Sequence, residues 1–346
     1  MTAPRPTPPS GGRVEMIHGA GGKAMAELIA SIFAPALANP YLAQGNDQAA
    51  LPIPAGGRLV FSTDGAVVSP LFFPGGDIGK LAVNGTVNDL AMAGATPLYL
   101  STSFIIEEGF PLADLDRVAR SMGAAARAAG VAVVTGDTKV VERGKADGLF
   151  IATAGIGVVP AGLELSGDRA RPGDRVILSG SIGDHGVAIL SQRENLSFAT
   201  DLESDCAALV PLVAAMVAAA GPDLRLMRDP TRGGLAATLN ELARQSGVGM
   251  ALEEAAIPVK PAVSAVCELL GLDPLTIANE GKLVAVVAPE AAETLLAAMR
   301  AHPLGAAAAI VGTVVEDPRR LVRMRTAFGG ERIVDWLAGE QLPRIC

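Results

Sequence analysis

Apolar residues along the chain follow two spacings, which predict a protein built of both helices and strands. Over 112–129, Leu115, Val118 and Met122 fall on one face of a helix. The short apolar run 58–62 is typical of a strand. The same patterns predict helices over 24–32, 77–92, 205–219, 232–245 and 289–300, and strands over 98–106, 131–135, 149–159, 176–179, 283–287, 310–315 and 321–324.

The spacing between the predicted strands favours an α+β fold with mixed sheets. Several neighbouring strands lie too close in sequence for the crossover helix that a parallel pair needs. A polar segment rich in Gly, Pro and Arg, 166–174, is the expected linker. It separates two halves with a similar alternation of predicted strands and helices. The length of 346 residues also fits two domains, at roughly 100–200 residues each.

Charge and composition exclude several classes of function. The chain has 28 Lys and Arg against 36 Asp and Glu, a net charge of −8, which argues against a basic nucleic-acid surface. The longest apolar run, Leu209–Ala220, is interrupted by Pro211 and is shorter than the roughly 20 residues of a membrane span. No apolar signal segment opens the chain, and 3 scattered cysteines do not form a disulfide framework. We therefore expect a cytoplasmic protein that binds neither nucleic acid nor membrane.

Aspartates close to predicted strand and helix ends are the first candidates for chemistry. Asp64 and Asp137 are expected to end strands, Asp89 lies on a predicted helix, Asp229 is expected to open a helix, and Asp47 lies in a loop. Each alone is more simply explained as an ordinary turn or helix cap. Together they would suit Mg²⁺ bound to a nucleotide, because this ion takes carboxylate and phosphate oxygens.

A Gly-rich segment, IHGAGGKAM, precedes the first predicted helix. Gly19, Gly21 and Gly22 come before Lys23, so backbone amides and one cation could face a phosphate. The segment does not match the Walker A pattern, and a flexible turn is the competing interpretation.

The chain ends in QLPRIC, with Cys346 as its last residue. Gly339 and the stiff Pro343 precede this thiol, which could act as a tethered substrate. The alternative is a disordered tail that happens to end in Cys. Cys206 and Cys267 fall in apolar helical patterns and are expected to be buried structural residues.

Taken together, these motifs resemble the HypE family of hydrogenase maturation proteins. This family belongs to the superfamily of aminoimidazole ribonucleotide synthetase, the glutamine-dependent purine synthetase and selenophosphate synthetase. The superfamily signals are the Asp47 loop, STDG at 62–65, NDLAMAGA at 88–95, TGDTKVV at 135–141 and DPTRGGL at 229–235. IHGAGGKAM and the terminal PRIC at 343–346 resemble the HypE family specifically. Gln48 departs from the pattern, because many relatives have a second acid there.

The resemblance implies two α/β-sandwich-like domains with mixed sheets, of the PurM-like type. The N-terminal domain would contribute to a dimeric, barrel-like core, so a homodimer is expected. The implied divisions are a flexible tail, Gly-rich loop and first helix over 1–40, an ATP-binding and dimerisation domain over 41–160, a C-terminal α+β domain over 161–338, and a mobile tail over 339–346.

The resemblance also implies a reaction. A carbamoyltransferase, HypF, would load a carbamoyl group onto Cys346, and ATP would be used to dehydrate it to a thiocyanate. The cyano group would pass to iron on the HypC–HypD scaffold as a ligand of the [NiFe] hydrogenase centre.

Roles for individual residues follow from the same resemblance. Cys346 would carry the substrate, Glu280 would act as general base, and Lys139 would stabilise charge on the amide oxygen. Mg²⁺ would be held by Asp47, Asp89 and Asp229. The nucleotide would be bound by Gly21, Gly22, Lys23, Asp64, Asn84, Gly136 and Asp137.

Two other functions remain open from the sequence. One is a small-molecule synthetase of the same superfamily, in which Cys346 is incidental. The other is a non-enzymatic carrier, whose terminal Cys only passes a group to a partner. In the preferred interpretation, the tail from Gly339 to Cys346 alternates between an outward position, reached by the carbamoyltransferase, and an inward position that meets ATP.

Overall fold

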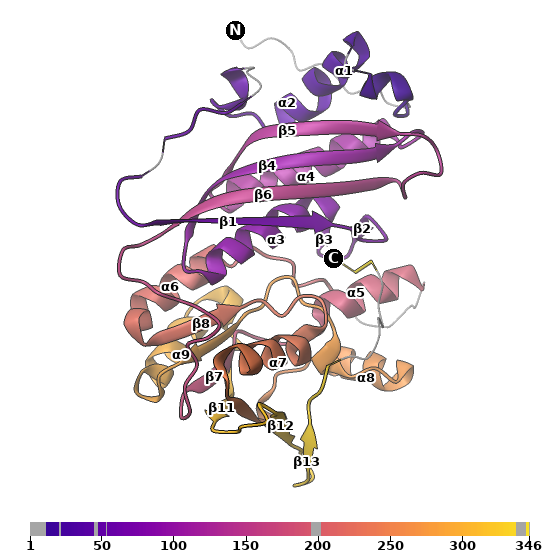
Figure 1. The fold of residues 1–346 in the computed structure, drawn as a ribbon. Coiled ribbons are helices and arrows are strands. Elements are labelled where there is room, and N and C mark those ends of the chain that lie inside the picture. The colour runs from indigo at the N-terminus through magenta and orange to yellow at the C-terminus, as the bar shows by residue number, and fades with distance from the viewer. Residues whose placement is uncertain are drawn as a thin grey trace.

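The computed structural model describes residues 12–20, 22–44, 48–52, 54–194, 202–336 and 344–345. These residues form two tiers, an upper tier around a four-stranded sheet and a lower tier around a seven-stranded sheet (Figure 1). The upper tier contains strands β1 (Arg58–Ala66), β2 (Phe72–Phe73), β3 (Gly76–Asp77), β4 (Thr96–Glu107), β5 (Ala132–Val141) and β6 (Leu149–Val159), and helices α1 (Lys23–Leu28), α2 (Ala34–Ala36), α3 (Ile78–Met92) and α4 (Leu112–Ala128).

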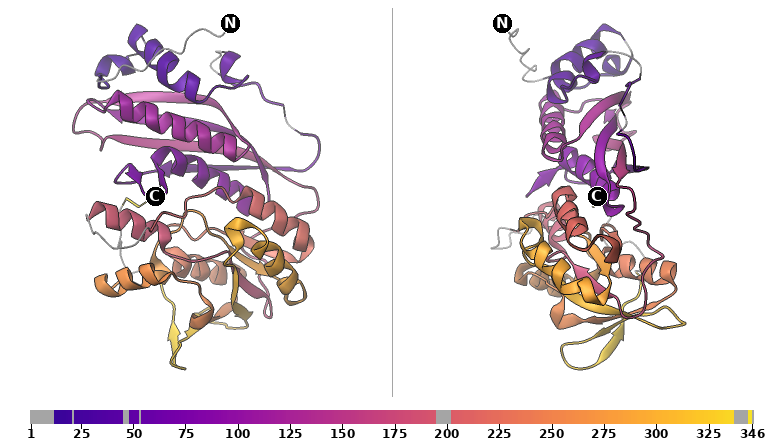
Figure 2. Two further views of the ribbon diagram at one scale, coloured as in Figure 1. Left: turned by 180° about the vertical axis from the view of Figure 1, so that it is seen from behind. Right: turned by 90° about the vertical axis from the view of Figure 1, so that its left-hand side faces the viewer.

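The upper sheet has the strand order β1-β6-β4-β5, with β4 and β5 parallel and the other neighbours antiparallel. Helices α3 and α4 cover the same face of this sheet (Figure 2). Alternate residues of β1 point to that face, so that Ser62 and Asp64 are partly buried while Leu59 and Phe61 are exposed on the other face. The side chain of Asp77 caps α3 by accepting from the amides of Gly79 and Lys80.

The lower tier is a mixed sheet with helices on both faces. Its strand order is β13-β12-β9-β11-β7-β10-β8, in which β9 and β12 are parallel. Its strands are β7 (Arg175–Leu178), β8 (Leu224–Arg228), β9 (Gly249–Glu253), β10 (Val284–Val287), β11 (Ala309–Val315), β12 (Val322–Arg325) and β13 (Glu331–Ile333), and its helices are α5 (Asp184–Arg193), α6 (Val210–Ala220), α7 (Gly234–Ser246), α8 (Pro261–Leu270) and α9 (Ala292–Arg300).

Strand β10 shows why strands of the lower sheet are continuous apolar runs in the sequence. Val284 and Val286 pack into one core with residues of α7, whereas Ala285 and Val287 pack into another with residues of α6 and α9. Since both faces of the strand are buried, every position is apolar. The mixed α+β class predicted from the sequence is confirmed.

The structure also corrects several predicted elements. The helix expected over 205–219 begins only at Val210, because the preceding residues extend along Glu280 and bond to it. Neither Asp64 nor Asp137 ends a strand, since β1 continues alongside β6 to Ala66 and β5 continues alongside β4 to Val141. Asp229 follows β8 directly and does not open a helix, since α7 begins at Gly234.

The sequence patterns missed several elements of the lower tier, namely α5, α8, β8, β9 and β13. Helix α5 was missed because it begins with the buried polar residues Asp184 and His185 and with Gly186, which leaves only the short apolar stretch 187–190. Across the described ranges, no helix is both long and apolar enough to cross a membrane.

Candidate active site between the two tiers

A cluster of carboxylates lies where the two tiers meet. We call Asp64, Asp89, Asp229 and Glu280 the carboxylate cluster. Asp64 comes from β1 and Asp89 from α3, while Asp229 follows β8 and Glu280 precedes β10. Ser62 Oγ donates to Asp89 Oδ2 at 2.6 Å, which joins β1 to α3 beside the cluster. Residues far apart in sequence are therefore brought to one site.

Gly85 allows helix α3 to approach strand β1 closely. A Cβ atom at this position would lie 2.3 Å from Asp64 Oδ2, well inside van der Waals contact. The missing side chain thus leaves the space that the Asp64 carboxylate occupies.

Burial, together with the charge of neighbouring carboxylates, raises the pKa values of Asp89, Asp229 and Glu280. Burial is the largest cause for Glu280, whose pKa lies well above 4.5, and the charges of Asp64, Asp205, Asp229 and Asp89 add to it. Burial and then the nearby Asp89 raise the pKa of Asp229 to about 7. Burial also raises the pKa of Asp89, against the hydrogen bond from Ser62. A site that gathers this much negative charge favours a cation.

The carboxylate cluster offers oxygen donors to a metal ion but does not form a closed site within the described residues. Among the described residues, no three His, Cys, Asp or Glu side chains are placed to close on one ion. Asp47, the remaining predicted ligand, lies outside the described residues. The Glu280 Oε1 atom is buried without a hydrogen-bond partner in this part of the chain, and Asp89 and Asp229 line a common cavity of about 340 Å³. Oxygen donors around an open space suit Mg²⁺, which keeps several waters and phosphate oxygens as ligands.

Glu280 is held by hydrogen bonds of its backbone. Its amide donates to Asp205 Oδ1 at 3.0 Å, and Lys282 Nζ lies 3.2 Å from Asp205 Oδ2. The carbonyl of Glu280 accepts from Asn88 Nδ2 at 3.3 Å. Asn88 Nδ2 also donates to the carbonyl of Ala207 at 3.0 Å. Asn88 therefore joins α3 of the upper tier to the segment that carries Glu280.

Asn84 lies near this junction but contacts a cysteine. Its Nδ2 donates to Cys206 Sγ at 3.4 Å, and both side chains are buried. Burial, followed by the charge of Glu280, raises the pKa of Cys206 to about 12, so this thiol is un-ionised at neutral pH. Cys206 and Cys267 are both buried as predicted, although Cys206 precedes α6 and is not helical.

The predicted residues of β5 lie apart from the carboxylate cluster. β5 forms one edge of the upper sheet and β1 the other, with β6 and β4 between them. Lys139 Nζ lies 2.6 Å from Asp137 Oδ2, and both side chains are more than half exposed. Within one chain, the predicted site is therefore divided between two places.

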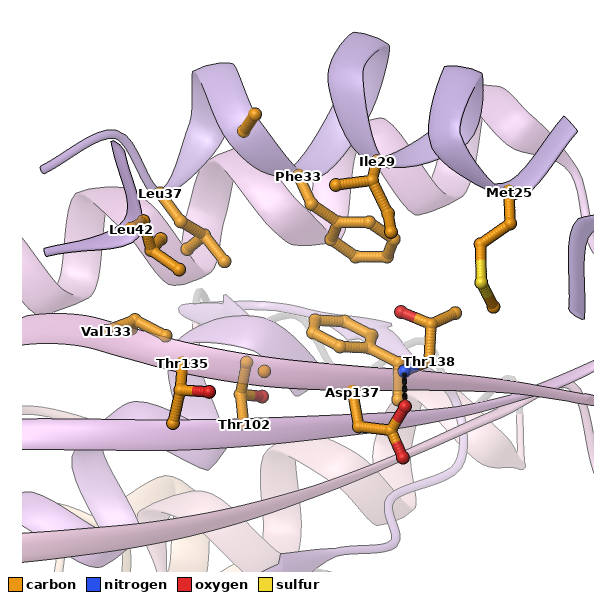
Figure 3. Close-up of a pocket in the computed structure, with 13 residues that line it drawn as sticks. Met25, Ile29, Phe33, Leu37, Leu42, Thr102, Val133, Thr135, Asp137 and Thr138 are labelled. Atoms are coloured by element: carbon orange, nitrogen blue, oxygen red, sulfur yellow. Dashed lines mark hydrogen bonds between the residues drawn. The ribbon is translucent and has the colours of Figure 1, made fainter. Parts of the chain in front are cut away.

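An apolar cavity of about 210 Å³ adjoins Gly136 and Asp137. Met25, Ile29 and Phe33 point down to it from the N-terminal helical segment, and the strands β4 and β5 form its floor (Figure 3). Such a pocket has the apolar walls and polar rim that small ligands use.

The Gly-rich loop is only partly described. Gly22 precedes α1 as its cap, and Lys23 Nζ lies 3.5 Å from Glu27 with both side chains largely exposed. Gly21 lies outside the described residues. His18 accepts a hydrogen bond from the amide of Glu15 at 2.9 Å, so this histidine has a local structural role.

The last described residues, Arg344 and Ile345, are docked between β2 and α5 (Figure 1). Ile345 is buried with residues of the upper core, and its carbonyl is 2.6 Å from His185 Nε2. The sequence alone indicates no role for His185, Ser204, Asp205 or Asn88, because their spacing matches no functional motif. Cys346 itself lies outside the described residues.

Comparisons with known proteins agree with this architecture. Residues 45–159 match the N-terminal domain of the AIR synthase related proteins, and residues 171–324 match the C-terminal domain. A carbamoyl dehydratase HypE from Rhizobium leguminosarum bv. viciae is 69% identical over 335 residues, covering 97% of this chain and 95% of the relative.

Two solved structures are also similar over most of the chain. A crystal structure of the hydrogenase maturation protein HypE in complex with ATP superposes with a TM-score of 0.92 at 51% identity, covering 96% of this chain and 99% of the other. One chain of the crystal structure of a HypE–HypF complex gives a TM-score of 0.79 at 47% identity, covering 91% of this chain and 100% of the other.

Proposed function

This chain belongs to the HypE family of AIR synthase related proteins, and from that premise we propose how its residues perform ATP-dependent carbamoyl dehydration. The enzyme converts a carbamoyl group on its own terminal cysteine to a thiocyanate. This product supplies the cyanide ligands of the [NiFe] hydrogenase iron. The protein is thus an enzyme whose substrate is part of its own chain.

The observation that carries this proposal is the connection between the docked chain end and Glu280. His185 bonds Ile345 on one side and Ser204 on the other, and Asp205 bonds the amide of Glu280. The residue next to Cys346 and the proposed general base are therefore held by one short segment.

The chemistry requires that the amide oxygen become a leaving group. This oxygen attacks the γ-phosphoryl group of ATP, and ADP departs. Loss of both N–H protons then expels phosphate and forms the C≡N bond, so the oxygen of the lost water leaves in phosphate. Phosphoryl transfer of this kind depends mainly on positioning and charge neutralisation.

Glu280 is our candidate to accept a proton from the amide nitrogen. Its raised pKa makes the carboxylate a stronger base than an exposed Glu, as general base catalysis near neutral pH requires. Its unpartnered Oε1 leaves an acceptor for the incoming N–H.

Asp89 and Asp229, with Asp47, would hold Mg²⁺ beside the cavity that the first two line. Such an ion neutralises charge on the phosphates. Asp64 and Asn84 would bind the nucleotide on one side of the same cluster.

We place the nucleoside part of ATP in the apolar cavity of Figure 3, against Gly136 and Asp137. Gly22 and Lys23, together with Gly21, would close it from the N-terminal side. The cavity and the carboxylate cluster lie at opposite edges of one sheet, so a second subunit is needed to bring them together.

A homodimer would supply that second subunit. Leu59 and Phe61 are 52% and 70% exposed on the face of the upper sheet that α3 and α4 leave open. Burying this face in a barrel-like dimer would remove both apolar exposure and the unpaired edges of β1 and β5. Asp137 and Lys139 of one subunit would then face Asp64 of the other, and Lys139 would stabilise charge on the amide oxygen.

We further propose that HypF loads the terminal thiol and that the HypC–HypD complex receives the cyano group. The HypE–HypF complex supports the first assignment. Cytoplasmic maturation fits the free, buried thiols of Cys206 and Cys267. We also propose that the chain is divided into an N-terminal segment (1–40), two domains (41–160 and 161–338) and a C-terminal tail (339–346).

Mass spectrometry of the terminal peptide tests the function directly. The carbamoylated protein should lose one water when Mg–ATP is added, whereas Cys346→Ser should bind ATP and show no such loss. If Cys346→Ser instead hydrolysed ATP when free carboxamides were added, the small-molecule synthetase would be the better assignment.

A further inference from the structure

The end of the described chain is held by its backbone carbonyls. The carbonyl of Arg344 accepts from the amide of Ser69 at 3.2 Å and from Arg193 Nη2 at 2.9 Å. The carbonyl of Ile345 accepts from His185 Nε2 at 2.6 Å. The Arg344 side chain pairs with Asp147, and the Ile345 side chain is buried. Docking thus uses the backbone as well as the two side chains.

His185 is built to donate to this carbonyl. It lies in the first turn of α5, is completely buried, and meets the ring of Phe73 edge-on at 5.6 Å. Burial lowers its pKa, in opposition to the nearby Asp205, so the ring is neutral. Because a carbonyl oxygen only accepts, the single ring proton is on Nε2.

The other ring nitrogen completes the arrangement. Nδ1 accepts a hydrogen bond from Ser204 Oγ at 2.8 Å, and the same oxygen accepts from the amide of Cys206 at 3.1 Å. Hydrogen bonds thus run from the amide of Cys206 through Ser204 and His185 to the carbonyl of Ile345, and they fix both the orientation of the ring and its tautomer. Ser204 is next to Asp205, the residue that holds the amide of Glu280.

An apolar residue would fill this position at less cost if packing were the only requirement, because a buried polar ring is favourable only when it is hydrogen-bonded. If Ile345 withdrew, His185 Nε2 would lose the carbonyl that it donates to. The protein is therefore less stable with Ile345 withdrawn than with Ile345 bound to His185.

We propose that His185 is a positioning residue for the dehydration step, holding the Ile345 carbonyl so that the adjoining Cys346 is presented inward. The role assigned to Cys346 rests on the proposed function. The docking of Ile345 by His185 is independent of that function and can be measured without ATP or a partner protein.

The experiment compares His185→Asn, His185→Gln and the control His302→Gln. Asn retains an amide near the position of Nδ1 but cannot reach Ile345, whereas Gln can place a donor near the position of Nε2. His302 only caps a short turn, through the amide of Leu304, and serves as the matched control. The readout is the alkylation rate of Cys346 by iodoacetamide, followed by the mass of the terminal peptide.

Loss of one neutral hydrogen bond predicts about 3- to 10-fold faster alkylation in His185→Asn. His185→Gln should recover part of the protection, and His302→Gln should match the wild type. ATP affinity should be unchanged in every variant, while His185→Asn should dehydrate the loaded cysteine correspondingly more slowly. A simple loss of fold would lower ATP affinity as well.

A folded His185→Asn protein that is alkylated at the wild-type rate would overturn the proposal. If this variant does not fold, Ser204→Ala is measured in its place, with about 2- to 3-fold faster alkylation expected from the freed ring. An unchanged rate there would equally overturn it. If the loaded wild-type protein lost no water with ATP while the differences in alkylation rate remained, the proposed function would be rejected. The docking of Ile345 by His185 would still stand.

Discussion

At the scale of single residues, Glu280 shows how the fold prepares a base. The side chain is 5% exposed and lies near Asp64, Asp89, Asp205 and Asp229, so both burial and charge oppose its ionisation. Its backbone is nevertheless fixed by Asp205 and Asn88. The protein therefore holds in place a group that is costly to ionise, as catalytic sites commonly do.

This cost gives a prediction for stability against pH. The folded pKa of Glu280 lies above its unfolded value, so the folded state binds more protons and loses stability as pH rises from about 4.5. Without divalent cations, Glu280→Gln should remove this loss, which is at most about 1.4 kcal/mol per pH unit. Urea unfolding at pH 5 and pH 8 measures it, with the exposed Glu290→Gln as control. A constant difference between Glu280→Gln and the wild type at both pH values would contradict the assignment.

At the scale of elements, α3 connects the two tiers. Its Asp89 and Gly85 face β1, while its Asn88 accepts from the amide of Leu209 at 2.8 Å and donates to Glu280. Nearly all of the helix is buried, so it shows little of the one-sided pattern of a surface helix. A small shift of α3 would thus alter the cluster and its support together.

Gly85→Ala tests this close approach. The added methyl group would displace the Asp64 carboxylate, so we expect about tenfold weaker Mg–ATP binding, similar to the loss of one charge-assisted hydrogen bond. The fold should persist, because Ala favours a helix over Gly by about 1 kcal/mol. Calorimetry measures the binding, and Asp64→Ala provides the control background. If Gly85→Ala weakened binding equally in that background, its effect would not pass through Asp64.

At the scale of the whole molecule, the proposed site residues lie at two separate edges of the upper sheet. Asp137 and Lys139 lie on the β5 edge, and Asp64 on the opposite β1 edge of the same sheet. The proposed dimer joins these edges between subunits, so each site would use residues of both chains.

Mixing two inactive variants distinguishes shared sites from separate ones. Asp89→Asn and Lys139→Ala should each dehydrate poorly alone. After equal mixing and subunit exchange, about a quarter of the sites should combine an intact Asp89 with the partner's intact Lys139. ATP-dependent water loss should therefore return to roughly a quarter of the wild-type rate. If each site were built within one chain, no mixed dimer would regain activity, and light scattering would show whether exchange had occurred.

The sequence by itself determined the alternation of helices and strands, the mixed sheets and the acidic motifs. Local spacing carries this information, because apolar periodicity reflects which faces are buried and short connections limit strand pairing. The helix over 112–129 and the strand over 149–159 were predicted within one residue of α4 and β6. Asp89 was placed correctly on a helix for the same reason.

Only the tertiary structure decided which of these residues meet. Asp64, Asp89, Asp229 and Glu280 converge because α3 packs against β1 and the lower tier closes beneath it, and no local pattern encodes such long-range contacts. The role of His185 could not be predicted from the sequence, because its partners, Ser204 and Ile345, lie 19 and 160 residues away. Hydrogen bonds between distant segments depend on the packing of the whole chain, so their partners become visible only once the chain is folded.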